Sequence, residues 1–388
     1  MWRLQLEWRY HVRGRLLLCF PEPLLQSMHT RNRQQIQHFH ERFELGSFIA
    51  DHNLDSGVCL YDCKASGGVF TVNGRRGCFM GTNTSDYIGF LNNNADIDLV
   101  MSHHAASGLK VLRVWGFNDT PVINTGANGL QRLDYVVRSA EAHGISLIIN
   151  FVNNWDDFGG IAAYATYYGI TRTAWYTSAP AQAQYQKYIA AVVARYESST
   201  AVFAWELANE PRCNGCDTSV LTGWVASTSA YVKSLDSNHM VCIGDGGFGL
   251  NGDTDTTYPY SDGEGLNFTA NLAISTIGFG TYHAYPGSWG ETDAWVPSWI
   301  QTHAAAAASV GKPVILEEYG SASSSKSVLG PWQAAVLSTQ TAGDMYWQYG
   351  DPLSYGLTHD DGHAIYYGSA DYDTYVTQHA AAMDAKVV

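Results

Sequence analysis

Short apolar runs alternate with longer amphipathic stretches from residue 70 to the end of the chain. Eight runs are apolar almost throughout, as expected of strands buried on both faces. They lie at residues 78–83, 111–117, 146–152, 202–210, 240–245, 277–285, 313–320 and 344–350. Helical spacing of apolar residues predicts helices at 98–107, 130–140, 185–196, 219–235, 295–310, 332–341 and 372–383. This strict alternation favours an α/β fold of one (β/α)8 TIM barrel over an open doubly wound sheet.

The pattern from residue 67 to residue 388 predicts a single domain of catalytic size. No Pro/Ser/Thr-rich linker or second module interrupts it. No Walker sequence follows a predicted strand, which counts against nucleoside triphosphate binding.

Residues 1–66 do not share this pattern. The first 45 residues carry seven Arg and no Lys, and the apolar run at 16–20 is too short for the core of a signal peptide. Two interpretations remain open: a transit-like or appended tail, or an artefactual extension of the reading frame in place of a true secretion signal. We therefore treat residues 1–66 as an N-terminal extension that is poorly ordered or a gene-model artefact.

Composition narrows the function classes. Among the 388 residues 46% are apolar, which excludes disorder for most of the chain. The formal net charge of −14 argues against general nucleic-acid binding. No apolar run approaches the length of about 18 residues that a membrane span requires. Only 15% of residues are charged while 13% are aromatic, a balance that suits a neutral polar ligand.

The seven cysteines contain one close pair, Cys213 and Cys216. A C-x-x-C pair can be redox-active, half of a zinc site or a local disulfide. No second pair lies at zinc-ligand spacing, and the pair follows a mid-chain strand, so we favour a local disulfide. The pairing of the other five stays open: Cys19, Cys59, Cys63, Cys78 and Cys242.

Acidic residues end two of the predicted strands. Pro211 stops the fourth strand directly after Glu210, and the seventh ends near Glu317 and Glu318. In a barrel these ends meet at one face, so the two strands predict a carboxylate pair over one cleft. Such a pair is typical of glycoside hydrolases, with one carboxyl of raised pKa as acid/base and one ionised as nucleophile. Glu206 lies deeper, and we expect it to be a buried structural partner.

Other strand ends carry polar and aromatic residues that strengthen this interpretation. Any single strand-end Glu can instead be half of a structural ion pair. Chance does not readily place so many polar and aromatic residues at further strand ends: an Arg, an Asn-Glu pair, a His-x-Tyr pair and a Trp. These residues are Arg113, Asn209, His283, Tyr285 and Trp347.

With these residues in place, the sequence resembles family 5 of the glycoside hydrolases, in particular the fungal endo-β-1,4-mannanases. The resemblance covers about residues 67–385. The matching stretches are GTN (81–83), LKVLRVWGFND (109–119), VNNWDD (152–157), WELANEPRCNGC (205–216), FGTYHAYP (279–286), EEYG (317–320) and DMYWQYG (344–350).

The resemblance implies a role for each site residue. Glu210 would be the acid/base, and Glu318 would be the nucleophile, because the family places its nucleophile before an aromatic–Gly pair. Strand alternation alone does not choose between Glu317 and Glu318. The remaining roles fall to six residues. Arg113 and Tyr285 would hold the nucleophile, Asn209 would contact the sugar 2-hydroxyl, His283 would support the acid/base, Trp347 would stack under the sugar, and Trp115 would line the cleft.

The function implied is that of a secreted, retaining endo-β-1,4-mannanase acting on mannan, glucomannan and galactomannan. We expect a monomer whose partner is a polysaccharide, with no cofactor, metal, nucleic acid or membrane. Two alternatives stay open: another family 5 specificity, such as glucan hydrolysis or mannoside trimming, and a carbohydrate-binding pseudoenzyme.

The sequence departs from the family pattern in two loops. The chain passes from Asp119 almost directly into the second helix, where the fungal mannanases have a much longer loop. The segment after the first strand lacks the usual Trp, and Tyr87 is the candidate to replace it. Of three Asn-x-Ser/Thr sequons, those at Asn83 and Asn118 lie near the expected cleft, which leaves Asn267 as the credible glycosylation site.

Overall fold

The computed structural model describes residues 63–84, 93–118, 129–250, 255–322 and 325–387. Several predictions lie outside these residues. They concern almost all of the N-terminal extension, Cys19, Cys59, Tyr87 and the shortened loop that follows Asn118.

Eight parallel strands form the centre of the described structure; seven lie within a predicted apolar run, and the eighth begins one residue before its run. They are β4 (Phe79–Asn83), β5 (Val111–Trp115), β6 (Ser146–Asn150), β7 (Val202–Glu206), β8 (Met240–Cys242), β9 (Gly280–Ala284), β10 (Val314–Tyr319) and β11 (Gly343–Tyr346). Every residue of these strands is buried, because the inner face packs in the barrel and the outer face packs under helices.

Hydrogen bonds link the strands in the order β8-β7-β6-β5-β4-β11-β10-β9. Backbone bonds between the segments of β8 and β9, the two strands at the ends of this order, complete the ring. Gly278 N donates to Val241 O over 2.8 Å, and His283 N donates to Gly246 O over 3.2 Å. The sequence-based expectation of a (β/α)8 barrel is therefore confirmed.

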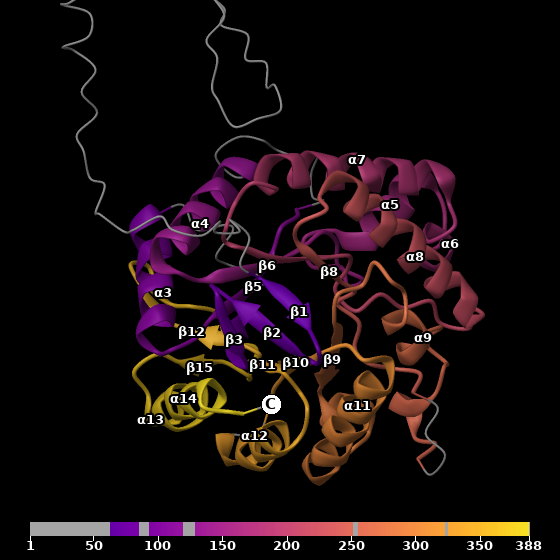
Figure 1. Cartoon of the computed structure of the whole chain (residues 1–388). Coiled ribbons are helices and arrows are strands. Elements are labelled where there is room, and N and C mark those ends of the chain that lie inside the picture. Colours follow the sequence, from indigo (N-terminus) through magenta and orange to yellow (C-terminus); the bar gives the residue numbers. More distant parts are fainter. Residues whose placement is uncertain (1–62, 85–92, 119–128, 251–254, 323–324, 388) are drawn as a thin grey trace, which may run out of the picture. The chain divides into compact units, whose positions relative to one another are not determined.

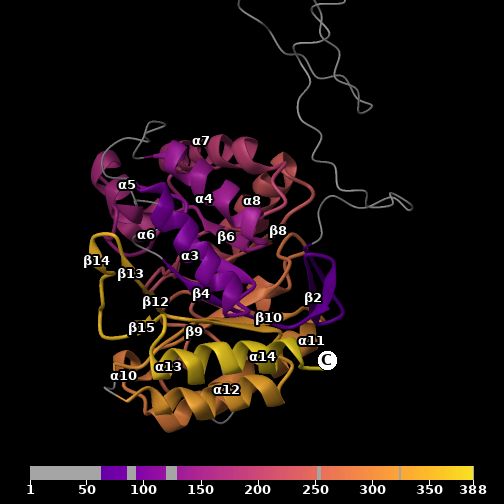
Figure 2. The same cartoon turned by 90° about the vertical axis from the view of Figure 1, so that its left-hand side faces the viewer.

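Helices alternate with the strands and surround them (Figure 1, Figure 2). Side-chain caps fix where some begin: Asn93 accepts from Ala95 N before α3, and Asp217 accepts from Ser219 N before α8. The longer helices are α3 (Asn94–Ala106), α4 (Leu130–His143), α5 (Gly160–Tyr168), α7 (Ala179–Tyr196), α8 (Thr218–Leu235), α11 (Val296–Val310), α12 (Leu329–Ser338) and α14 (Gln378–Asp384). None of the described helices is long and apolar enough to cross a membrane.

A small antiparallel sheet covers the amino-terminal end of the barrel. It consists of β1 (Lys64–Ser66), β2 (Val69–Val72) and β3 (Arg75–Gly77), and it lies over the centre of the ring in Figure 1. Phe70 of β2 contacts three barrel phenylalanines, with ring centroids 5.3–5.5 Å apart: Phe79, Phe203 and Phe279. Because β1 pairs with β2, regular structure begins three residues before the expected boundary at residue 67.

Several predicted strands extend too far toward the carboxyl end. The fourth strand ends at Glu206, four residues before Glu210, although Leu207 still donates a backbone bond to the last residue of β8, and Ala208 and Glu210 donate to the chain after it. The apolar run continues beyond the ladder because this segment is buried beneath the cleft. The last predicted helix is also interrupted, since a π-helical turn at Asp373–Thr377 separates α13 (Ala370–Tyr372) from α14.

Candidate active site

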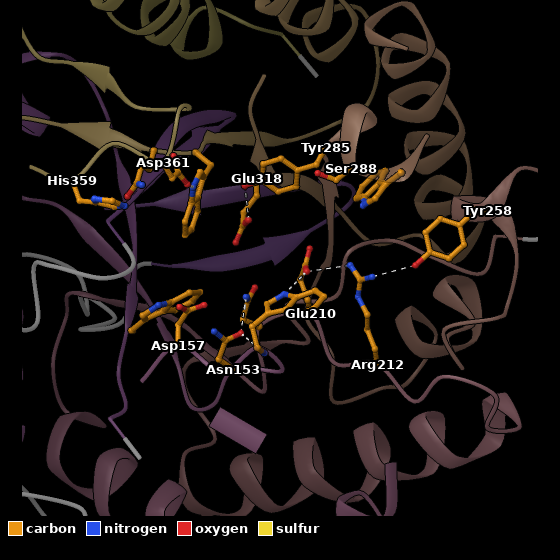
Figure 3. A pocket seen from close by; sticks show the side chains of 16 residues that line it. Asn153, Asp157, Glu210, Arg212, Tyr258, Tyr285, Ser288, Glu318, His359 and Asp361 are labelled. Carbon is orange, nitrogen blue, oxygen red and sulfur yellow. Dashed lines mark hydrogen bonds and ion pairs between the residues drawn. The ribbon is translucent and has the colours of Figure 1, made fainter. Parts of the chain in front are cut away.

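A cleft opens where the carboxyl ends of the barrel strands meet (Figure 3). Its volume is about 580 Å³. Both aromatic rings and polar groups line it. The lining residues are Trp115, Asn153, Trp155, Asp157, Asn209, Glu210, Arg212, Tyr258, Tyr285, Ser288, Trp289, Glu318, Trp347, Gln348, His359 and Asp361.

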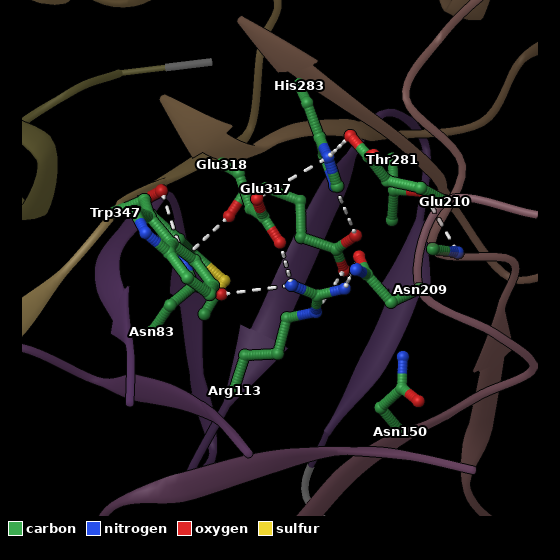
Figure 4. Close-up of polar contacts among 12 residues, drawn as sticks. Asn83, Arg113, Asn150, Asn209, Glu210, Thr281, His283, Glu317, Glu318 and Trp347 are labelled. Carbon is green, nitrogen blue, oxygen red and sulfur yellow. Dashed lines mark hydrogen bonds and ion pairs between the residues drawn. The ribbon is translucent and has the colours of Figure 1, made fainter. Parts of the chain in front are cut away.

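Arg113 of β5 lies under the floor of this cleft and is almost completely buried (Figure 4). Its Nε and Nη2 donate to the two oxygens of Glu206 over 2.6 and 2.7 Å, and Nη2 also donates to Asn209 Oδ1 over 2.8 Å. Nη1 donates to Glu318 Oε1 and to Asn83 Oδ1. Burial alone would lower the pKa of Arg113, but the surrounding carboxylates raise it well above its ordinary value, so the cation is permanent.

Glu318 of β10 reaches the cleft from the opposite side of the barrel. Besides Arg113, it accepts a hydrogen bond from Tyr285 Oη over 2.7 Å. Burial and the Glu318 charge raise the pKa of Tyr285, which keeps its hydroxyl a donor. The pairing of β10 with β9 shifts register between Leu316 and Glu318. This irregularity lets two consecutive carboxylates, Glu317 and Glu318, both approach Arg113, which strict alternation would forbid.

Glu210 faces Glu318 across the cleft from the segment after β7. Its backbone is in the left-handed region at φ 47°, and its N–H donates to Gly244 O over 2.7 Å. Its carboxylate contacts three donors: His283 Nδ1 at 2.8 Å, Trp155 Nε1 at 2.7 Å and Arg212 Nη2 at 3.1 Å. The turned backbone aims the carboxylate at these donors.

The charge state of Glu210 differs from the expectation of a raised pKa for the acid/base. Burial alone would raise the pKa of Glu210. Arg212 and the hydrogen bonds from His283 and Trp155 stabilise the anion more strongly, so the pKa lies below its ordinary value. The carboxylate is therefore ionised in the free site.

His283 of β9 connects the two carboxylates. Its Nδ1 lies 2.8 Å from Glu210 Oε1 and 3.6 Å from Glu318 Oε2. Burial alone would lower the pKa of His283, but Glu318, Glu210 and Glu317 raise it to about 10, so the ring is protonated at neutral pH. Asn209 completes the centre, accepting from Arg113 and donating through Nδ2 to Asn153 Oδ1 over 3.0 Å.

Two tryptophans flank the carboxylates. Trp115 and Trp347 lie with ring centroids 6.3 Å apart, and the Arg113 guanidinium lies 5.0 Å from the Trp115 ring. Trp347 Nε1 donates to Asp361 Oδ2 over 2.7 Å, which fixes the orientation of the indole. The structure thus brings together all eight predicted site residues: six line the cleft, and Arg113 and His283 support it from below.

A family model described as cellulase (glycosyl hydrolase family 5) matches residues 70–352. The chain belongs to glycoside hydrolase family 5. Mannan endo-1,4-β-mannosidase A of Aspergillus aculeatus is 57% identical over 343 residues, which cover 83% of this chain and 91% of the relative. The mannan endo-1,4-β-mannosidase A of Podospora anserina is 52% identical over 350 residues, covering 85% and 93%.

Solved structures agree with this family membership. The endo-1,4-β-mannanase from Rhizomucor miehei superimposes with a TM-score of 0.77 at 35% identity, covering 84% of this chain and 99% of its own. The endo-β-1,4-mannanase from Thermotoga petrophila gives a TM-score of 0.74 at 32% identity, covering 80% and 78%. The resemblance to family 5 predicted from the sequence is confirmed.

Sequence reasoning missed several residues of this family 5 site. Trp155 and Arg212 contact Glu210, and Asn153 contacts Asn209. All three come from loops, in the runs after β6 and β7. Their position after a strand end was the available signal, but a sequence does not show which loop side chains turn back over the barrel.

The cysteines and sequons of this family 5 domain also have defined places. Cys213 and Cys216 form the predicted disulfide, with Cα atoms 5.4 Å apart, while Cys78 and Cys242 are buried thiols. Asn83 is buried, and its Nδ2 donates to Glu317 O over 3.0 Å, so it is not available for glycosylation.

A single group in the described part of the chain has the spacing of a metal site: Glu206, Cys242 and Glu317, whose ligand atoms lie within 4.8 Å. Arg113 already occupies the carboxylate oxygens of Glu206. Burial raises the pKa of the Cys242 thiol well above its ordinary value, which disfavours the thiolate that a metal would need. This group is therefore a poor ligand set.

Proposed function

We propose that this protein is a retaining endo-β-1,4-mannanase that hydrolyses internal bonds of mannan, glucomannan and galactomannan. The carboxylate pair Glu210 and Glu318, joined through His283 at the floor of an aromatic-lined cleft, carries the proposal. The substrate class is supported by the relatives, since mannan endo-1,4-β-mannosidases are more than half identical over more than four fifths of the chain.

The separation of the carboxylates supports retention of configuration. One nitrogen, His283 Nδ1, lies 2.8 Å from Glu210 Oε1 and 3.6 Å from Glu318 Oε2. The two oxygens therefore lie no farther apart than the sum of these distances. This limit is compatible with the roughly 5–5.5 Å between the carboxyl groups of retaining enzymes. The geometry favours direct attack by one carboxylate.

In the first half-reaction Glu318 attacks the anomeric carbon, and Glu210 gives a proton to the leaving oxygen. The permanent cation of Arg113 and the hydroxyl of Tyr285 both donate hydrogen bonds to Glu318 and orient its carboxylate for attack. Asn209, held by Arg113 and Asn153, is placed to contact the hydroxyl at C2 of the sugar, where hydrogen bonds strengthen in an oxocarbenium-like transition state.

Glu210 must be protonated in one half-reaction and ionised in the other, so the donors around its carboxylate affect both steps. In the free site its donors favour the anion, which suits the second half-reaction, in which Glu210 takes a proton from the attacking water. In the first half-reaction it must carry a proton. A bound sugar displaces water from the cleft, and its hydroxyls compete for Arg212 and Trp155, so binding shifts Glu210 toward the protonated form.

The cleft wall provides the sugar contacts. Sugars present apolar C–H faces, and Trp347 and Trp115 offer rings beside the carboxylates. Trp155 lies on the Glu210 side, and His359 and Asp361 lie on the Glu318 side, as Figure 3 shows for the labelled residues. A neutral polysaccharide fits such a wall, because few of the hydrogen bonds that its hydroxyls form need charged partners.

Product analysis tests the proposal. The protein should release reducing sugar from mannan much faster than from carboxymethyl-cellulose, and NMR of the first products should show the β-anomer. Glu318→Ala should abolish hydrolysis, and Glu210→Ala should lower it by about 10²–10⁴-fold. An α-anomeric product, or full activity of Glu318→Ala, would refute the mechanism. Preference for the glucan would indicate another family 5 specificity, and mannan binding without hydrolysis would indicate a pseudoenzyme.

We also propose that the enzyme acts outside the cell as a monomer. The disulfide between Cys213 and Cys216 supports an oxidising compartment. A polymeric substrate supports secretion as well. Light scattering of the secreted protein checks the monomer, which so far remains a prediction.

A further inference from the structure

We propose that Glu317, the residue before the nucleophile, is a positioning residue for the acid/base. It holds His283 in its charged form between Glu210 and Glu318, and thereby sets the upper pH limit of catalysis. The inference rests on the proposed double displacement, and it assigns a role to a side chain that does not touch the substrate.

Glu317 is placed for such a role below the cleft floor. It is fully buried and does not line the cavity that contains Glu318. Its Oε2 lies 3.4 Å from His283 Nε2. Its Oε1 has no hydrogen-bond donor within the described structure, and the nearest cation, Arg113 Nε, is 3.8 Å away. A buried carboxylate with one oxygen unbonded is unfavourable for stability, so its presence calls for another reason.

The surroundings of His283 supply that reason. Both ring nitrogens face carboxylates: Nδ1 faces Glu210 and Glu318, and Nε2 faces Glu317 (Figure 4). A neutral imidazole has one N–H and would turn a lone pair toward one of these anions. The imidazolium has two N–H groups and satisfies both sides. Glu317 thus acts on His283 as a buried carboxylate does on a histidine in a hydrolase triad, by fixing orientation and charge.

The other charged groups around this pair agree with the assignment. Asp245, after β8, is the further acidic group near His283, and burial raises its pKa to about 7, so it contributes only part of a negative charge. Burial, reinforced by the Glu317 charge, likewise raises the pKa of Glu206 to about 7, although Arg113 opposes this. Glu317 is therefore the anion that faces Nε2 directly.

The variant Glu317→Gln should separate this role from a structural one. Without the anion at Nε2, His283 loses its proton more easily, and Glu210 then faces a neutral ring. Glu210 should hold its own proton to higher pH, so the alkaline limb of the kcat/KM profile on mannan should move up by at least about one pH unit.

A matched control is Asp236→Asn. Asp236 is also a buried carboxylate beside a histidine, with its Oδ2 2.6 Å from His239 Nδ1, but it precedes β8 at the other end of the barrel. The variant Asp236→Asn should lower the thermal unfolding temperature without moving either limb of the kcat/KM profile. With a dinitrophenyl mannobioside, whose leaving group needs no proton, Glu317→Gln should show no shift of the alkaline limb relative to wild type.

The outcomes distinguish this inference from the proposed function. If wild type does not hydrolyse mannan, the function fails. If wild type is active but Glu317→Gln lowers the rate equally at every pH, Glu317 is only structural and the inference is overturned. If Glu317→Gln does not fold, ¹⁵N NMR of His283 in the wild-type chain decides. A doubly protonated ring up to about pH 8 supports the inference, and a neutral ring at pH 7 overturns it.

Discussion

The substitution Arg113→Lys tests whether the guanidinium, rather than a charge alone, organises the site. The five hydrogen bonds of Arg113 reach four acceptor residues: Asn83, Glu206, Asn209 and Glu318. A guanidinium has five N–H donors in a plane, whereas an ammonium has three. At least two of the five bonds are therefore lost, even if the lysine reaches the same position.

The expected loss follows from those two bonds. Hydrogen bonds to charged groups contribute about 1.5–3 kcal/mol each, so the free energy of unfolding should fall by about 3–6 kcal/mol. This is a large part of the total of about 5–15 kcal/mol that a domain has. Activity should fall further, because Glu318 and Asn209 both lose a fixed donor. A displacement of about 1 Å in such groups lowers the rate by about 10²-fold.

Urea denaturation and kcat/KM on mannan measure the two effects. The control is Arg195→Lys, since Arg195 also forms a two-bond pair, with Asp134, but more than a third of its side chain is exposed. This control should change the free energy of unfolding by less than about 1 kcal/mol and leave activity unchanged. The reasoning is refuted if Arg113→Lys stays within the range of the control in both measurements.

Two further predictions concern the backbone and the charge of the site. Gly244 has φ +80°, and a Cβ there would lie 2.1 Å from Ala208 O and 2.3 Å from Glu206 Oε1. Gly244→Ala should therefore lower the free energy of unfolding, measured by urea denaturation, by at least about 1–3 kcal/mol. It should also displace Glu210, whose N–H donates to Gly244 O, so wild-type activity of the variant would contradict this prediction. The pKa of His283 is raised from 6.5 to about 10, so its contribution to stability is present below about pH 6.5 and is lost as pH rises toward 10. Urea denaturation at pH 6 and 9 should show this fall, and His283→Gln should reduce it; an equal fall in the variant would exclude His283 as its source.

The barrel could be predicted because each strand is buried on both faces. Such strands are continuous apolar runs, and all eight could be identified from their composition. Their ends could not, because burial continues past the ladder. Leu207 and Ala208 are fully buried and still donate backbone bonds to the end of β8 and to the residue after it, so nothing in their composition separates the strand from the loop that carries Glu210.

The chemistry of the site was predictable in its residues but not in its charges. Glu210, the pair Glu317 and Glu318, and their strand-end partners follow from the rule that barrel function lies at carboxyl ends, whereas the choice of Glu318 came from the resemblance to family 5. The pKa of Glu210 depends instead on Arg212, which folds back from two residues away, and on Trp155, which arrives from the loop after β6. Both donors lie on the side of Glu210 that opens to the cleft, while His283 contacts it from below. Substrate can therefore contact two of the three donors directly. The third donor, His283, lies out of its reach, and Glu317 maintains the charge on that ring. In this arrangement the proton affinity of the acid/base is set partly by the bound sugar and partly by a residue that the sugar never contacts.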